Sequence, residues 1–99
     1  MIGSATGLRS RVLTVEGIAG APEVYEIELR GGAAEAADGH GPATCEHIVV
    51  MAGTLVVQVG DEEARLEPGD SLFFRADRPH RYLNPETTDA RALLVMVYA

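Results

Sequence analysis

Short apolar segments separated by turn residues constrain the fold of this chain more than any other feature of its sequence. Eleven glycines and five prolines recur at fairly regular intervals along 99 residues, and long stretches of helical period are absent. Short segments bounded in this way are typical of an antiparallel sandwich or barrel. The pattern therefore predicts an all-β fold with eight or nine strands.

The clearest expected strand covers residues 23–29, in which Tyr25, Ile27 and Leu29 alternate strictly with Glu26 and Glu28. This alternation predicts one buried face and one solvated face. Residues 31–41 are rich in Gly and Ala and favour a loop or a weak edge strand, with a helical turn at 33–37 as the alternative. The remaining expected strands cover residues 9–15, 45–51, 54–59, 62–66, 71–75, 80–84 and 91–98.

Two short segments have the composition of tight turns. In the segment 67–70, Pro68 fixes φ and Gly69 accepts a positive φ, as the two central positions of a type II turn require. Gly60 and Asp61 separate two expected strands and predict a two-residue hairpin turn.

Composition and charge restrict the partners that we expect. Hydrophobic residues make up 46% and charged residues 23%, as in ordinary globular domains, and the net charge is −7. An acidic chain is repelled by phosphate groups, so we expect no direct nucleic-acid contact and no membrane contact. The first residues lack the apolar region of a signal peptide, and the single Cys45 excludes an internal disulfide framework. We expect one cytoplasmic domain over residues 1–99, with residues 1–8 flexible.

Three histidines and one glutamate provide the chemistry in the middle of the chain. His40, His47 and His80 carry imidazole nitrogens and Glu46 carries a carboxylate, and such donors are suited to a divalent transition metal. The sequence has no phosphate-binding loop, dinucleotide glycine pattern, Ser-His-Asp arrangement or Cys-x-x-Cys. Metal chemistry or pocket chemistry is therefore what we expect, and we assign no catalytic residue.

The spacing of these residues adds to their chemistry. His40 is followed by Pro42, Glu46 and, after six intervening residues, Gly53. This arrangement resembles the first motif of the cupin superfamily, which has two histidines, a glutamate and a glycine. Pro42 stands where that motif has its second histidine, so one of the four metal ligands that the resemblance implies is missing.

A second stretch matches the other cupin motif at its full spacing. That motif is a glycine followed by a histidine and an asparagine, and this chain has Gly69, His80 and Asn84. Within the superfamily the chain is most similar to the C-terminal cupin of XRE-type helix-turn-helix regulators. That likeness lies in residues 9–13, 46–47 and 76–84.

The resemblance implies a single antiparallel cupin, or jelly-roll, β-barrel with its core over residues 23–99. It also implies a small-molecule-binding domain that senses an effector for a bacterial transcriptional regulator, with a DNA-binding domain preceding it in the full protein. The alternative is a stand-alone metal-dependent cupin enzyme of the oxygenase or isomerase type. Because one ligand is missing and the chain is acidic, we favour the sensor.

Strand alternation places the candidate residues on two faces. In residues 45–51, Glu46 shares a face with Ile48, whereas Cys45 and His47 lie on the other. The resemblance implies that Glu46 is the inward residue, so His47 faces away from the pocket. The expected metal ligands, for Fe, Mn, Ni or Zn, are His40, Glu46 and His80. Without a metal these three residues contact the effector, and the ligand-binding set is His40, Glu46, His80, Tyr82 and Asn84.

The apolar positions predict further features of the fold. We expect one sheet to present an inner face made of Glu46, Ile48, Val50, Leu55 and Val57. The aromatic residues Tyr25, Phe73, Phe74 and Tyr82 are expected in the core or pocket wall, and Cys45 in a buried or interfacial position. Residues 49–51 and 93–97 are apolar on both faces. A monomer hides such faces poorly, so we expect a homodimer formed by sheet packing or by exchange of the strand at 9–15.

Overall fold

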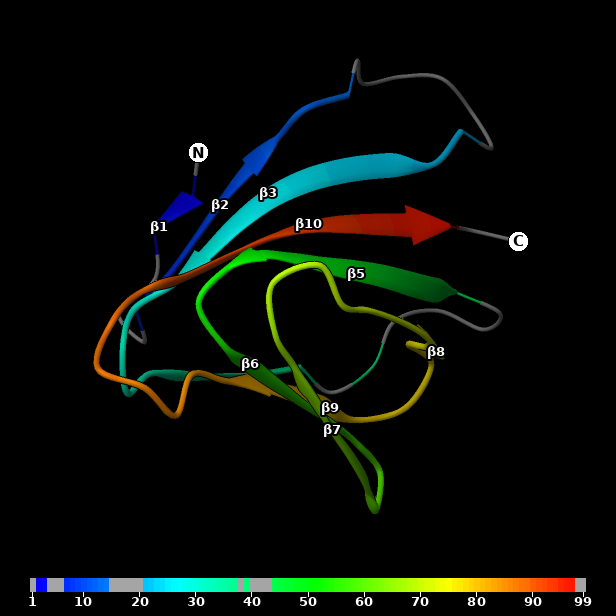
Figure 1. Cartoon of the computed structure of the whole chain (residues 1–99). Helices are drawn as coiled ribbons and strands as arrows, with labels where there is room; N and C mark the ends of the chain where they lie inside the picture. The colour runs from blue at the N-terminus through cyan, green and yellow to red at the C-terminus, as the bar shows by residue number, and fades with distance from the viewer. Residues whose placement is uncertain (1, 4–6, 15–20, 38, 40–43, 98–99) are drawn as a thin grey trace.

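The structure is a computed structural model that describes residues 2–3, 7–14, 21–37, 39 and 44–97 (Figure 1). These residues form ten strands and no helix, so no described helix could cross a membrane. The strands are β1 (Ile2–Gly3), β2 (Leu8–Val12), β3 (Glu23–Leu29), β4 (Ala34–Ala37), β5 (Cys45–Ala52), β6 (Leu55–Val59), β7 (Glu62–Leu66), β8 (Ser71–Arg75), β9 (His80–Leu83) and β10 (Ala90–Val97).

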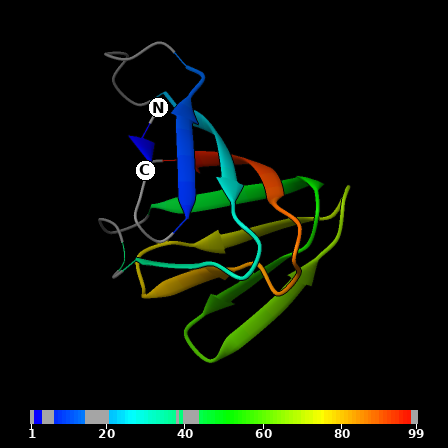
Figure 2. The same ribbon diagram turned by 90° about the vertical axis from the view of Figure 1, so that its left-hand side faces the viewer.

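The strands form two antiparallel sheets that face each other (Figures 1 and 2). The larger sheet has the order β1-β2-β3-β10-β5-β8, and the smaller sheet has the order β4-β9-β6-β7. The chain passes between the sheets at several loops, among them those that join β3 to β4 and β5 to β6. This arrangement confirms the all-β antiparallel barrel that the sequence predicts.

The core lies between the two sheets because each strand turns alternate side chains inward. In β3, Ile27 and Leu29 are buried while the glutamates between Tyr25 and Leu29 are only partly covered. In β5, Glu46, Ile48 and Val50 are buried. The other buried apolar residues are Leu55, Val57, Leu66, Phe74, Ala76, Tyr82, Ala90, Ala92 and Met96.

The structure corrects two expectations about this core. Leu55 and Val57 are buried, but they belong to β6 in the smaller sheet, whereas Glu46 and its inward neighbours belong to the larger sheet. The inner surface is therefore shared between two facing sheets. Phe73 is 62% exposed, because alternation along β8 turns Leu72 and Phe74 inward and Phe73 outward.

Residues 34–37 form an edge strand, which excludes a helical turn there. β4 pairs with β9 alone, and its partners run from Leu83 opposite Ala34 to His80 opposite Ala37. Three alanines and one glutamate have little strand preference of their own, so this pairing determines the conformation. The expected strand at 9–15 is observed as Leu8–Val12, and position 15 lies outside the described residues.

The turn between β7 and β8 has the geometry that its composition predicts. Gly69 has φ +92°, and the amide of Asp70 donates a 2.9 Å hydrogen bond to the carbonyl of Glu67. Gly60, in the hairpin between β6 and β7, has φ +58°. Both glycines therefore occupy the left-handed region that the turns require.

Candidate functional site

Three polar side chains from two sheets meet in the interior of the barrel. Glu46 comes from β5 in the larger sheet, and His80 and Tyr82 come from β9 in the smaller sheet. Only 1% of Glu46, 2% of His80 and 7% of Tyr82 is exposed. Polar groups buried to this extent are costly unless they are paired, and these three side chains lie against one another.

The carboxylate of Glu46 is the centre of this polar triad. The Tyr82 hydroxyl donates a hydrogen bond to Glu46 Oε1. His80 Nε2 lies 3.1 Å from Glu46 Oε2, and His80 Nδ1 lies 2.9 Å from the main-chain carbonyl of Arg78. A carbonyl only accepts hydrogen bonds, so Nδ1 carries a proton and the ring is fixed in orientation.

The protonation of the triad follows from these contacts. The hydrogen bond to Glu46 raises the pKa of His80, burial opposes this effect, and the Arg78 carbonyl adds to the increase. Burial, followed by the charge of Glu46, raises the pKa of Tyr82, which therefore remains a neutral hydroxyl donor. A protonated His80 donates from Nδ1 to the Arg78 carbonyl, and its charged ring forms an ion pair with Glu46 through Nε2, which lies 3.1 Å from Oε2.

Strand register explains why this triad forms. His80 and Tyr82 are two residues apart in β9, so they share the inward face. Opposite them in β6 lie Val59 and Val57, which are also turned inward. Val57 is buried, and these apolar neighbours keep the triad away from bulk water.

A cavity of about 270 Å³ opens beside the triad. Its walls come from β2, β3, β5 and β10 of the larger sheet and from β4 and β9 of the smaller one. The lining residues are Leu8, Ser10, Tyr25, Ile27, Glu35, Ala36, Ala37, Glu46, His80, Tyr82, Leu94 and Met96. Most of this lining is apolar, with a few convergent polar groups, as is typical of small-molecule sites.

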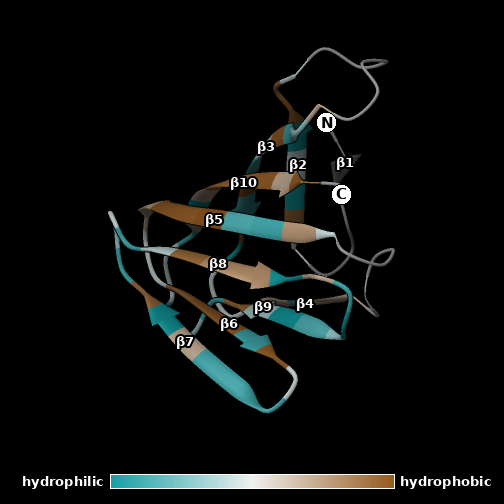
Figure 3. Cartoon of the chain, turned by 90° about the vertical axis from the view of Figure 1, so that its right-hand side faces the viewer, coloured by the Kyte–Doolittle hydropathy of each residue, from teal (hydrophilic) through white to brown (hydrophobic). Residues whose placement is uncertain are grey.

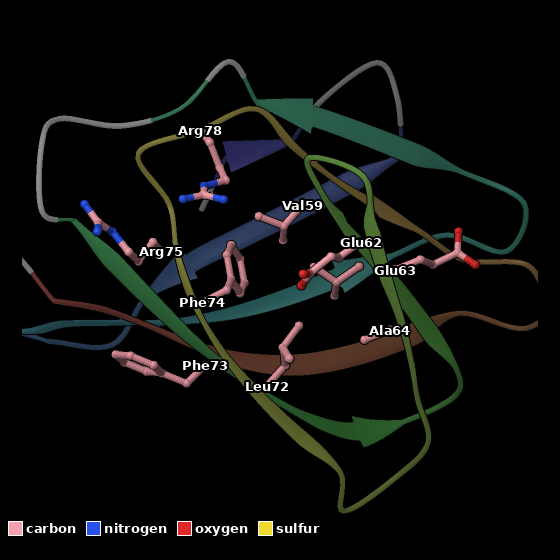
Figure 4. A pocket seen from close by; sticks show the side chains of 10 residues that line it. Val59, Glu62, Glu63, Ala64, Leu72, Phe73, Phe74, Arg75 and Arg78 are labelled. Carbon is pink, nitrogen blue, oxygen red and sulfur yellow. The ribbon is translucent and has the colours of Figure 1, made fainter.

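A second hollow of about 310 Å³ lies at the other side of the barrel, between β7 and β8 (Figure 4). Arg75 and Arg78 lie on its β8 side and Glu62 and Glu63 on its β7 side, and all four are exposed. No charged group in its lining is buried, and the lining contains no member of the triad. The cavity beside Glu46 is therefore the better candidate site, although it is slightly smaller.

The structure places the other predicted residues as follows. Asn84 is 2% exposed, and its side chain is engaged by the main chain: Nδ2 donates to the carbonyls of Leu29 at 2.9 Å and Thr88 at 2.8 Å. Oδ1 of Asn84 accepts from the amide of Glu86 at 3.0 Å. Asn84 thus fixes a loop at the end of the barrel and is not part of the cavity lining.

His47 and Cys45 both lie on the outer face of β5, as strand alternation and the cupin resemblance together predict, and both are half-buried. The ring of His47 makes an edge contact with Phe73, with 6.0 Å between the centroids. His40 and Pro42 lie outside the described residues.

The described residues do not make a metal site by themselves. They contain no group of three His, Cys, Asp or Glu side chains placed to hold an ion. Of the expected ligands, Glu46 and His80 are present, but their donor atoms face each other and Tyr82 takes the other carboxylate oxygen. A catalytic metal needs about three protein ligands, so this donor set does not fit one without a contribution from elsewhere.

Sequence reasoning missed Glu35 and Met96 as lining residues. Glu35 belongs to the stretch for which a loop or weak strand was expected, so its orientation was not predicted. In the structure Glu35 pairs with Tyr82 and shares its inward face. The sequence feature that could have indicated this role is a charged residue in a segment that is otherwise made of alanines.

The fold and the site agree with comparisons to known proteins. A family model described as a cupin domain matches residues 25–96, and the chain therefore belongs to the cupin family. No curated protein sequence matches the chain.

Among solved structures, the chain is similar to the cupin domain of an XRE family transcriptional regulator from Enterobacter cloacae. The TM-score is 0.88 at 24% identity, covering 94% of this chain and 98% of that one. An HTH_3 family transcriptional regulator from Vibrio cholerae gives a TM-score of 0.86 at 22% identity, over 94% of this chain and 52% of the regulator. A sugar phosphate isomerase of the cupin superfamily from Silicibacter pomeroyi gives 0.76 at 25% identity, over 94% and 60%. The chain thus spans about half of the Vibrio protein.

Proposed function

We propose that this cupin domain binds a small-molecule effector in the cavity beside Glu46 and serves as the sensing part of a bacterial transcriptional regulator. The observation that carries the proposal is the cavity itself, a largely apolar space of about 270 Å³ with the buried polar triad of Glu46, His80 and Tyr82 on its wall. Similarity to the cupin domains of two regulators supports the regulatory context. Such a role places the protein in the cytoplasm.

The sensing step is a shift between two conformations of the barrel. An effector changes the populations only by its difference in affinity for the two states. The acidic charge of the domain disfavours direct DNA contact, so the shift acts on a DNA-binding domain elsewhere in the full protein or on its partner. A helix-turn-helix segment in the reading frame upstream of Met1 would support this arrangement.

Effector binding can be tested with a thermal-shift screen of small metabolites against the wild type and two variants. We expect stabilising compounds to lose most of their effect in His80→Ala, because His80 lines the cavity. They should keep it in His47→Ala, because His47 faces outward. If the compounds stabilise His80→Ala as strongly as the wild type, or lose their effect in His47→Ala, the assigned site is wrong.

The alternative is a stand-alone metal-dependent enzyme, and the similarity to a sugar phosphate isomerase favours it. Elemental analysis of the same protein, purified without chelator, distinguishes the metal-dependent enzyme from the effector sensor. One equivalent of Fe, Mn, Ni or Zn that is lost in His80→Ala would support the enzyme, with His40 as a further ligand. A metal content far below one equivalent supports the sensor.

We also propose that the domain is a homodimer that packs the outer faces of the larger sheets together. Phe73, Met51 and Val97 are 62%, 49% and 41% exposed and lie on the adjacent strands β8, β5 and β10. Figure 3 shows apolar residues along much of β5 and on β10. Burying such a patch between two copies removes apolar surface from water.

Light scattering at micromolar concentration tests the dimer. We expect a mass of twice 10.5 kDa, and a shift towards 10.5 kDa when Phe73 is replaced by Glu. A control substitution, Glu62→Gln on β7, should leave the mass unchanged. A wild-type mass of 10.5 kDa would contradict the proposal.

A further inference from the structure

The hollow between β7 and β8 has the features of a second binding site (Figure 4). These two strands follow each other in the chain and are joined by the tight turn at 67–70, yet they belong to different sheets. Within the described part of the chain, β7 pairs only with β6 and β8 only with β5. The two strands therefore diverge from the turn, and a space of about 310 Å³ opens between them.

The floor of this hollow is apolar and is separate from the cavity beside Glu46. Its residues are Val57, Val59, Ala64, Leu72 and Phe74. Val57 is 1% exposed and Phe74 is 8% exposed, so the deepest part of the floor belongs to the core. The ring of Phe74 also contacts the ring of His80, with 5.4 Å between the centroids. Phe74 thus lies between the hollow and the polar triad, and no residue lines both cavities.

Glu62 projects into the hollow from the β7 side. It lies opposite Val59 in the ladder with β6, and Val59 shares a face with the buried Val57. Directly paired residues lie on the same face of a sheet, so Glu62 is on the inward face of β7. Its carboxylate makes no hydrogen bond or ion pair with a described residue. The adjacent Glu63 faces outward and accepts a 2.7 Å hydrogen bond from Gln58.

Two arginines on the β8 side share a single carboxylate. Arg75 Nη2 lies 2.7 Å from Asp77 Oδ2, and Arg78 Nε lies 3.8 Å from Asp77 Oδ1. Neither arginine has another acidic partner among the described residues. This side of the hollow therefore carries one positive charge in excess. A guanidinium group offers a fork of donors that fits a carboxylate, and both arginine side chains are more than half exposed and accessible to a ligand.

The opposite charges on the two sides remain apart. Glu62 and Arg78, both in the described part of the chain, form no ion pair with each other, because the hollow lies between them. A molecule with one charge would satisfy only one side, whereas a molecule with both charges would satisfy the two sides together. A volume of about 310 Å³ has room for roughly ten groups the size of a water molecule.

We propose that this hollow binds a small linear zwitterion, which has a carboxylate and an ammonium group at the two ends of a short apolar body. The carboxylate lies at Arg78, the ammonium group lies at Glu62, and the apolar body packs on Phe74 and Leu72. An apolar floor with a few polar groups that fix orientation is typical of small-molecule sites. The inference goes beyond the proposed function, because it concerns a different cavity.

Three probes of equal chain length test the inference: 6-aminohexanoate, hexanoate and hexylammonium. Their binding to the full chain at pH 7 is measured by NMR titration, following the methyl resonances of Leu72 and Val59. We expect 6-aminohexanoate to bind about 3- to 5-fold more tightly than either of the other two probes. The factor is modest because ion pairs at exposed side chains contribute little.

Two substitutions assign the two ends of the zwitterion. Glu62→Gln should weaken 6-aminohexanoate about 3- to 5-fold, to the affinity of hexanoate, and should not weaken hexanoate itself. Arg78→Gln should weaken 6-aminohexanoate and hexanoate by about the same factor and should not weaken hexylammonium. Asp61→Asn and Arg91→Gln are the matched controls, because they remove exposed charges outside the lining, and they should leave all three affinities unchanged.

Each contrary outcome has a definite meaning. If hexanoate or hexylammonium binds as tightly as 6-aminohexanoate, or if the controls weaken binding as much as the two lining variants, the zwitterion site is wrong. If 6-aminohexanoate shifts Leu94 and Met96 in place of Leu72 and Val59, it occupies the cavity beside Glu46. The inference then fails, while the proposed effector site stands. If 6-aminohexanoate shifts no methyl resonance at millimolar concentration, the hollow is not a site for such a molecule.

Discussion

Replacing Glu46 by Leu is expected to lower the free energy of unfolding by about 3–5 kcal/mol, the cost of removing one partner from a buried charge pair. The substitution leaves the Tyr82 hydroxyl and the His80 ring buried without their common acceptor. Urea unfolding at pH 6 measures the loss. Glu62→Leu, at an exposed position, is the control and should change the free energy by less than about 0.5 kcal/mol.

A double-mutant cycle shows whether the loss comes from the triad. Tyr82→Phe alone should cost about 1–3 kcal/mol, because it removes a donor to a buried carboxylate. In the Glu46→Leu background the same substitution should cost nothing or stabilise the protein, because the hydroxyl has lost its acceptor. Additive losses would mean that the two side chains act independently and that the triad is not an energetic unit.

The pH dependence of the free energy of unfolding provides a readout of the Glu46–His80 pair. The pKa of His80 is raised in the folded protein above its ordinary value of 6.5. The resulting stabilisation is fully present below that value and is lost as the pH rises through the higher pKa of the folded state. The difference between wild type and Glu46→Leu should therefore narrow from pH 6 to pH 9, and a constant difference would contradict the assigned protonation.

Replacing Gly53 by Ala is expected to cost about 3–4 kcal/mol. Gly53 has φ +76°, and a Cβ there would lie 2.7 Å from the Asp89 carbonyl oxygen and 2.9 Å from Ala90 Cα. Backbone strain and overpacking each cost about 1–3 kcal/mol, and main-chain atoms cannot move aside as a side chain can. Thermal and urea unfolding measure the loss.

Gly69→Ala is the matched control for that substitution. Gly69 also has a positive φ, +92°, but no heavy atom lies within 4 Å of the position of its Cβ. It should therefore cost only the conformational term, about 1–2 kcal/mol. Equal losses at the two positions would show that the close approach of Asp89 and Ala90 to Gly53 has no energetic weight.

Much of the fold could be predicted because alternation is a local property. The pattern in residues 23–29 and 45–51 determined which side chains share a face. The resemblance to cupins implied that Glu46 is on the inner face and His47 on the outer one, and the structure places them so. The tight turn at Pro68 and Gly69 was also local, since its two residues select the φ values that it needs.

The remaining features depend on contacts between distant segments. β4 is a strand because β9 pairs with it, and four residues of low strand preference do not indicate this. The hydrogen bond from Tyr82 to Glu46 spans 36 residues and forms only when the two sheets face each other. Asn84 was expected to bind ligand, yet its amide is bonded to the main chain of Leu29 at the end of β3 and of the loop between β9 and β10, which spacing alone could not indicate.

A single strand, β5, separates the cavity from the outer face of the larger sheet, and this has a consequence for communication through the domain. Glu46 points into the cavity and the adjacent His47 points to the outer face, where it touches Phe73. The wall between the interior and the proposed dimer surface is therefore a single backbone, and neighbouring residues belong to different surfaces. A twist of that backbone around an occupant would reorient both sets of side chains at once, with no relay of intermediate residues.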